Sequence, residues 1–371
     1  NGSVEIDEDE YDYVLIIGGL MTIYVVFGGM IATSWVQIVK TILLMTGTFL
    51  LSLIVFSHFK WDIMNLIENV NRGTPLGDQF FLPGHLLGNP VEMFSLYLAL
   101  ILGTAGLPHI LIRFYTVKNV KEVRRSVLTA SGIIGAFYIM TLILGLGTVA
   151  LIGHDALVAA DSTGNLAAPL LAKALGGDFL LAFISAVAFT TVVAVVAGLV
   201  ISATTAFSHD IYHHIIKKKN TTEKEQLRAA QWTAFGIGLI STLFALGLEN
   251  INVTFLVSLT FIVAASSNLP VLLFTIYWKR FNQWGAVIGM ISGLIASIVL
   301  LLFGPHIMNP EAGWILKEPI FTIYNPGIVA IPIGFIGAVL GSLLTKSPDE
   351  KHFDFNLFYI KAHTGITARR D

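Results

Sequence analysis

The stretch Leu102-Gly103-Thr104-Ala105-Gly106-Leu107-Pro108-His109 lies within the apolar segment from Met93 to Ile112. A helix needs about 20 mostly apolar residues to cross the hydrocarbon core of a bilayer, and this segment has that length. Its two glycines and its proline free backbone N–H and C=O groups at mid-membrane depth. Such groups are tolerated there only against protein or in a wet cavity. The stretch therefore predicts a transmembrane helix that is broken near its middle.

Eight further apolar stretches of similar length flank this segment. They are Tyr13 to Phe27, Trp35 to Phe56, Val127 to Ile152, Phe179 to Phe207, Ala229 to Leu248, Ile251 to Trp278, Trp284 to Phe303 and Gly327 to Leu344. Hydrophobic residues make up 55% of the chain and charged residues only 12%, which excludes a soluble globular domain. We therefore expect an all-α polytopic membrane protein with nine transmembrane helices, whose partner is the lipid bilayer and not nucleic acid.

Lysine and arginine fall almost entirely on one set of alternate loops. Of the 22 Lys and Arg residues, all but four follow the third, fifth, seventh and ninth spans or lie near the start of the second. The four on the opposite side are Lys60, Arg72, Lys173 and Lys317. Because loops rich in Lys and Arg stay in the cytoplasm, the pattern predicts an external N-terminus and a cytoplasmic C-terminus.

The broken third span is the first candidate binding site. Unpaired backbone donors and a half-helix dipole at such a break suit an anionic substrate. We expect the substrate to contact Gly103, Thr104, Ala105, Gly106 and His109. The alternative is a kink made only for packing, since Gly and Pro are frequent in membrane helices. Arg113, near the cytoplasmic end, is expected to extend its charge toward the interface.

Two other spans carry polar residues at their centres. Thr190 and Thr191 in the fifth span could offer hydroxyls to a cation, or simply bond back to their own helix. In the seventh span, Pro270 frees a carbonyl one turn upstream, beside the polar side chains Ser266, Ser267 and Asn268. These three either line a pathway or form a hydrogen-bonded kink.

Small residues and histidines elsewhere are expected to have structural roles. Gly285, Gly289 and Gly293 recur at four-residue spacing, which predicts a smooth ridge for close helix packing. His213-His214 and Lys217 to Lys219 follow an interfacial tyrosine, and we interpret them as a positive anchor at a cytoplasmic helix end. We expect no metal site there, no cofactor and no enzyme chemistry. The chain has no cysteine, which excludes disulfides and thiolate ligands.

With these segments in view, the chain resembles the sodium:solute symporter family, and within it the acetate permease branch. The resemblance is carried by stretches spread over most of the chain: Tyr24 to Met30, Thr33 to Ile38, Gly103 to His109, Arg113 to Val117, Phe183 to Phe189, Ala194 to Leu199, Ser208 to Tyr212, and Arg280 with Gly285-Ala286. It implies a partial leucine-transporter-type fold, which is built from two inverted five-helix repeats.

The resemblance also implies that the chain begins at about the fifth span of its relatives, so that the missing N-terminal helices of the parent chain become an expected partner. On that plan the chain divides into 1–12, an extracytoplasmic loop remnant; 13–57, the last two helices of the first repeat; 58–91, an extracytoplasmic loop; 92–278, the second repeat; 279–345, two trailing helices; and 346–371, a cytoplasmic tail.

The coupling ion is left open by the same resemblance. Thr191 matches a position whose backbone carbonyl binds the cation in sodium-coupled relatives. The two adjacent positions that carry hydroxyl ligands in those relatives hold Ala194 and Val195 here. Thr190, Thr191 and Ala194 are therefore a weak candidate cation site, and either Na⁺ or H⁺ is expected as the coupling ion.

The function implied is symport of acetate or a similar short monocarboxylate with a cation, by alternating access, in the bacterial cytoplasmic membrane. The alternative is a membrane-embedded sensor built on the same fold. Only 27 residues follow Leu344, fewer than a signalling kinase and its linker need. A channel is a weaker alternative, because no filter motif is present.

Overall fold

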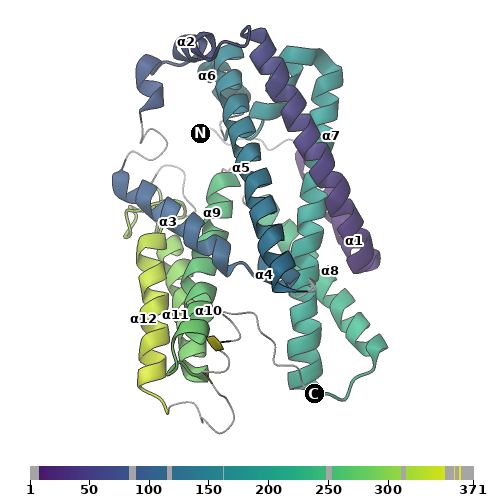
Figure 1. Cartoon of the computed structure of the whole chain (residues 1–371), viewed down its shortest axis with the longest axis vertical. Coiled ribbons are helices and arrows are strands. Elements are labelled where there is room, and N and C mark those ends of the chain that lie inside the picture. The colour runs from purple at the N-terminus through teal and green to yellow at the C-terminus, as the bar shows by residue number, and fades with distance from the viewer. Residues whose placement is uncertain are drawn as a thin grey trace. The chain divides into compact units, whose positions relative to one another are not determined.

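The computed structural model describes residues 8–82, 89–114, 119–161, 163–247, 253–310, 315–346, 355 and 359–360. The first seven residues and nearly all of the expected C-terminal tail lie outside this part. Apart from an isolated β-bridge between Met308 and Ile315, every element within it is a helix (Figure 1). The elements are α1 (Glu8–His58), α2 (Ile63–Gly73), η1 (Gly77–Phe81), α3 (Pro90–Gly106), α4 (Pro108–Phe114), α5 (Val120–Leu151), α6 (His154–Ala160), α7 (Ala167–Thr205), η2 (Ala206–Ile216), α8 (Glu223–Gly247), α9 (Val253–Val263), η3 (Ala264–Asn268), α10 (Leu269–Tyr277), α11 (Gln283–Leu302) and α12 (Gly327–Leu343).

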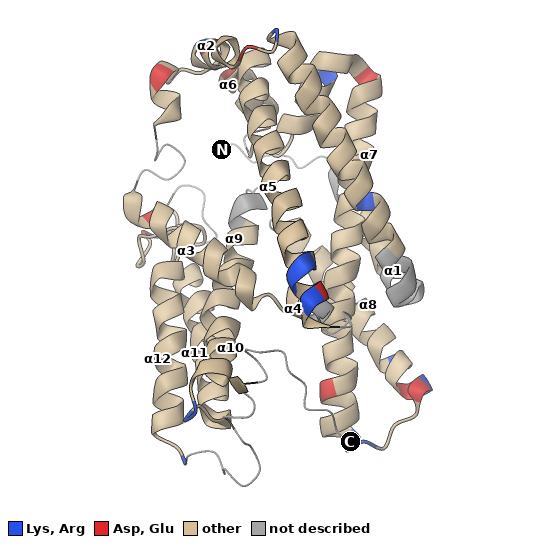
Figure 2. Cartoon of the chain, viewed as in Figure 1, with Lys and Arg blue, Asp and Glu red and all other residues tan. Residues whose placement is uncertain are grey.

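The predicted spans are confirmed as apolar helices. Among the described residues, seven helical segments are long and apolar enough to cross a membrane, and two shorter apolar helices, Leu15–Tyr24 and Gly327–Leu343, match the first and last predicted spans. Most charged residues lie at helix ends and connections, while long stretches of α7, α11 and α12 contain none (Figure 2). The fold class expected from the sequence is therefore correct.

The first two spans differ from the prediction in their connection. Two separate spans were expected, Tyr13 to Phe27 and Trp35 to Phe56, but α1 continues through the residues between them as one helix of 51 residues. At 1.5 Å per residue it is about 75 Å long, more than twice the thickness of a hydrocarbon core. The physical reason is local: no proline interrupts residues 28–34, and Gly28-Gly29 weakens a helix without ending it.

The fifth span begins where the sequence placed it. The helix assigned as α7 is bent at Gly176 and Gly177, and Gly177 has φ +63° and ψ −157°, a conformation that other residues rarely adopt. The apolar helix that follows this bend starts beside Phe179, the predicted first residue of the span. The helix then widens at Ala206 into the π-helix η2, which the sequence did not predict.

The helices form two compact units, which we describe separately. The first consists of the described parts of 1–80 and 125–252, and the second of the described parts of 81–124 and 253–371. In the first unit α1 packs on α7 and α8. Its apolar core includes Leu51, Val55, Leu66, Val70 and Leu171. In the second unit α3, α9, η3, α11 and α12 pack together around Ala99, Ile262, Ala265, Ala330 and Ile331.

A reciprocal glycine–threonine fit joins α1 and α8 within the first unit. A Cβ atom at Gly18 would lie within 3.0 Å of the side chain of Thr242, and one at Gly238 equally close to the side chain of Thr22. Each threonine hydroxyl donates back to its own helix, Thr22 to Gly18 O at 2.8 Å and Thr242 to Gly238 O at 2.9 Å. Small residues at such crossings let membrane helices approach closely.

Candidate functional site

The predicted break in the third span is present and consists of a single non-helical residue. α3 ends at Gly106, Leu107 has an extended backbone with φ −73° and ψ 116°, and α4 begins at Pro108. Proline lacks an N–H group and disfavours a helical conformation in the residue before it, which explains why the chain opens at Leu107. The N–H groups of Ile110 and Leu111 then bond to Leu107 O at 3.2 and 3.3 Å.

The two glycines of the break face the seventh span. Both are buried, and a Cβ atom at Gly103 would lie within 3.0 Å of Phe261 O, while one at Gly106 would lie equally close to Ala264 O. These oxygens belong to the backbone and cannot rotate away. Gly103 and Gly106 are therefore required for close packing of α3 against α9 and η3, the packing role that the sequence left open for the break.

Asn268 connects the two polar segments that the sequence singled out. Its Nδ2 donates to Gly106 O at 3.0 Å. In an uninterrupted helix Gly106 O would accept from the N–H of Ile110, but that group bonds to Leu107 O. The side chain of η3 thus satisfies a carbonyl freed by the break in α3. This contact could not be read from the sequence, because 162 positions separate the two residues.

The remaining residues of the break lie on its other side. Thr104 and Ala105 are exposed and His109 is half-buried. The Thr104 hydroxyl donates to Leu100 O at 2.7 Å within its own helix. The five residues predicted to contact substrate are therefore divided into two glycines that pack against η3 and three residues that are at least partly accessible. The side chain of Arg113 lies outside the described part of the chain.

The seventh span has the irregularity that Pro270 predicts. Residues Ala264–Asn268 form a π-helical turn, because Pro270 cannot donate to the carbonyl of Ser266. Ser266 O lies against α11 and α12, where a Cβ at Gly293 or Gly334 would come within 3.0 Å of it. The predicted ridge of Gly285, Gly289 and Gly293 is confirmed, since all three are buried and meet α12 or η3 closely.

The serine side chains of this turn are held by hydrogen bonds. Ser266 is fully buried, and its Oγ lies 2.9 Å from Ser297 Oγ, which in turn donates to Gly293 O at 2.8 Å. Ser267 Oγ donates to Val263 O at 2.6 Å. Ser266 and Ser267 thus have packed, hydrogen-bonded positions, while Asn268 is half-buried and bonded to the break.

The candidate cation residues lie on α7, in the first unit. Thr190 Oγ1 donates to Ala186 O and Thr191 Oγ1 to Val187 O, each at 2.8 Å, as hydroxyls in membrane helices often do. Ala194 is buried, and its carbonyl accepts a bond from Gln37 Nε2 of α1 at 2.5 Å. Sequence reasoning missed Gln37 as a partner of this site, although a lone amide in an apolar span is a signal that could have found it.

Comparison with known proteins identifies the family. The model of the sodium:solute symporter family matches residues 9–293. The uncharacterized symporter YwcA of Bacillus subtilis is 55% identical over 96% of this chain and 70% of its own length. A protein of Corynebacterium glutamicum named monocarboxylic acid transporter is 43% identical over 99% of this chain and 70% of its own length.

A solved structure shows the same fold. A substrate-bound, outward-open Na⁺-coupled sialic acid symporter superposes with a TM-score of 0.64 at 15% identity, covering 94% of this chain and 69% of the other. The apolar helices, the broken third span and the irregular seventh span are all present in a chain whose family match covers most of its length. This multi-pass membrane protein therefore belongs to the sodium:solute symporter family.

Proposed function

We propose that the protein carries out secondary active symport of acetate or a similar short-chain monocarboxylate with a cation, Na⁺ or H⁺, across the bacterial cytoplasmic membrane. The relative named monocarboxylic acid transporter, alike over nearly the whole chain, supports this substrate class. The proposal includes the division into a first-repeat remnant at 13–57 and a second repeat at 92–278.

The accessible edge of the α3–α4 break is the place we propose for the substrate carboxylate. Gly103 and Gly106 pack against the backbone of α9 and η3. This leaves Thr104, Ala105 and His109 to contact a ligand. Thr104 and Ala105 are small, and the exposed Thr104 hydroxyl can exchange its bond to Leu100 O for one to an anion. A hydrogen bond to a charged group contributes about 1.5–3 kcal/mol, so this hydroxyl is a significant part of the binding energy of a small acid.

The Thr104→Val substitution tests this placement. We expect it to raise the apparent Michaelis constant for acetate about tenfold or more, because about 1.5–3 kcal/mol of substrate binding is lost. Uptake of labelled acetate into proteoliposomes, with Na⁺ and pH gradients imposed separately, measures both the substrate and the coupling ion. Thr104→Ser retains the hydroxyl and should remain near wild type.

Thr275→Val is the matched control for this experiment. Thr275 is also exposed and also donates to its own helix, to Val271 O at 2.6 Å on α10. Equal affinities for wild type and the Thr104 variant would exclude Thr104 as a substrate contact. Absence of acetate uptake under either gradient, in protein that inserts normally, would instead refute the proposed transport function.

The proposed orientation places the connection between α6 and α7 outside and the connection between η2 and α8 in the cytoplasm, as the distribution of Lys and Arg indicates. Single cysteines at the exposed positions Asn165 and Asn220 can test this in a chain that has no other cysteine. We expect a membrane-impermeant thiol reagent to label Asn165→Cys in intact cells and Asn220→Cys only after lysis. The reverse pattern would show that the topology is inverted.

A further inference from the structure

The π-helix at the end of the fifth span brings together histidines that an α-helix would separate. In η2 the backbone N–H groups donate to carbonyl oxygens five residues earlier, as Lys217 N does to Tyr212 O at 2.9 Å. In an α-helix, at about 100° per residue, His214 would point away from His209 by about 140°. In the π-helix His214 follows His209 by one turn.

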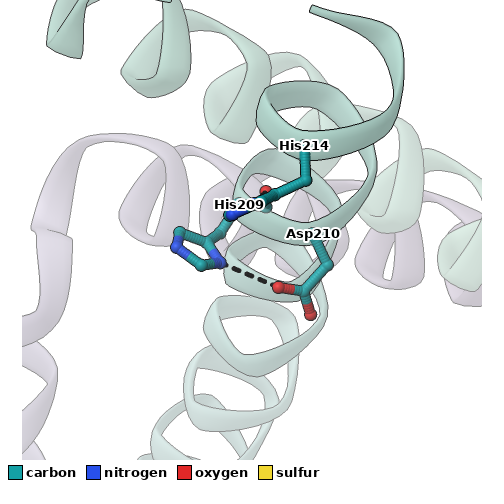
Figure 3. A group of neighbouring side chains, drawn as sticks. All are labelled: His209, Asp210 and His214. Atoms are coloured by element: carbon teal, nitrogen blue, oxygen red, sulfur yellow. Dashed lines mark hydrogen bonds and ion pairs between the residues drawn. The ribbon is translucent and has the colours of Figure 1, made fainter. Parts of the chain in front are cut away.

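The three imidazole rings of η2 lie in one cluster. The ring centroids of His209 and His214 are 4.7 Å apart, those of His213 and His214 4.8 Å, and those of His209 and His213 6.0 Å. His209, Asp210 and His214 lie side by side (Figure 3). One potential metal-ligand atom from each residue lies within 4.8 Å of those of the other two. All three side chains are exposed, and they follow Phe207, the predicted last residue of the fifth span, so we expect a solvated ion to reach them.

The rings of His209 and His214 are each held by a hydrogen bond at Nδ1. His209 Nδ1 lies 2.8 Å from Asp210 Oδ1, shown as a dashed line in Figure 3, and His214 Nδ1 lies 2.8 Å from His209 O. Both partners are oxygens that accept, so each Nδ1 carries the proton and each Nε2 keeps its lone pair. A metal-binding histidine almost always has this arrangement, with the second nitrogen bonded to a carboxylate or a backbone carbonyl.

The third ring is anchored to the segment that follows η2. His213 Nδ1 contacts Thr221 Oγ1 and lies 3.1 Å from Gln226 Nε2, which also donates to Thr221 Oγ1 at 2.9 Å. This network ties the last turn of η2 to the start of α8. It keeps His213 beside His214 and limits the freedom of the whole histidine cluster.

We propose that His209, Asp210 and His214 form a binding site for a divalent transition-metal ion of the Zn²⁺ or Ni²⁺ type. Nε2 of each histidine is a ligand, Asp210 Oδ1 orients His209 through its Nδ1, and water completes the coordination. Imidazole suits these metals, whereas Mg²⁺ and Ca²⁺ prefer oxygen ligands. The adjacent Lys217, Lys218 and Lys219 disfavour ions that are held by charge alone. The proposal replaces the sequence-based expectation of a purely positive anchor.

Zinc titration of the purified protein tests the site. The protein is prepared without a polyhistidine tag in detergent, and Zn²⁺ binding is measured by isothermal titration calorimetry. We expect a site that is lost in the double variant His209→Ala/His214→Ala and weakened about 10–100-fold in Asp210→Asn, because that change removes the carboxylate that orients His209. Circular dichroism without metal checks that the variants keep their helices.

The matched control is His154→Ala. His154 and Asp155 form a similar adjacent pair, with Nδ1 3.3 Å from Oδ1, but α6 contains no second histidine. This variant should bind Zn²⁺ as wild type does. A second readout uses the unmodified chain: Zn²⁺ should protect His209 and His214, and not His154, from diethyl pyrocarbonate, as followed by mass spectrometry. Equal zinc affinity and stoichiometry in wild type and double variant, or equal modification with and without Zn²⁺, would overturn the proposal.

Discussion

The Gly334→Val substitution is expected to prevent stable folding of the second unit. A Cβ atom at this position would lie within 3.0 Å of Ser266 O and Ser266 C. The same turn is also crowded from α11, because a Cβ atom at Gly293 would lie within 3.0 Å of Ser266 O. Overpacking a core typically costs about 1–3 kcal/mol and sometimes more. Here the opposing atom is a backbone carbonyl that no side-chain rotation can move, so we expect the upper end of that range or beyond.

The measurement is the yield of monodisperse protein in detergent together with its thermal unfolding. Gly132→Ala provides the control, because no heavy atom lies within 4 Å of the Cβ it would add to α5. That change should be neutral or stabilise the helix by about 0.5–1 kcal/mol. A Gly334→Val protein with wild-type yield and unfolding would show that α12 does not pack on η3 as described.

The Asn268→Leu substitution should destabilise the protein by about 1–3 kcal/mol, the cost of leaving a buried carbonyl without its partner. Gly106 is buried, and Asn268 Nδ2 is the donor to its carbonyl oxygen at 3.0 Å. Water cannot replace this donor in an apolar environment. Unfolding in mixed micelles with increasing SDS measures the loss, and acetate uptake should fall with it because the break loses its support.

Ser267→Ala is the control for this prediction, since the Ser267 hydroxyl bonds to Val263 O at 2.6 Å and has only a long 3.4 Å contact with Asn268 Oδ1. Its removal leaves Gly106 O bonded and should change stability clearly less than Asn268→Leu does. Equal stability of both variants would mean that the Asn268 bond to the break contributes little to the fold.

Local sequence predicted where the third and seventh spans are irregular, but not which residues contact these irregularities. Pro108 and Pro270 act on their own helices, by lacking an N–H group and by crowding the preceding backbone, so their positions alone located both irregularities. The use made of each irregularity depended on neighbours far along the chain. Gly103 and Gly106 were expected to contact substrate, and the structure places them against Phe261 and Ala264.

The sequence by itself determined the fold class, the apolar helical segments and the breaks in the third and seventh spans, because span length, hydropathy and proline chemistry are properties of short segments. Only the tertiary structure decided that Asn268 satisfies Gly106 O and that Gln37 bonds to Ala194 O. It also revealed the π-helix that aligns His209 with His214. The physical reason is that a freed carbonyl, an amide or an imidazole can bond to many partners, and packing between distant segments selects which one it meets.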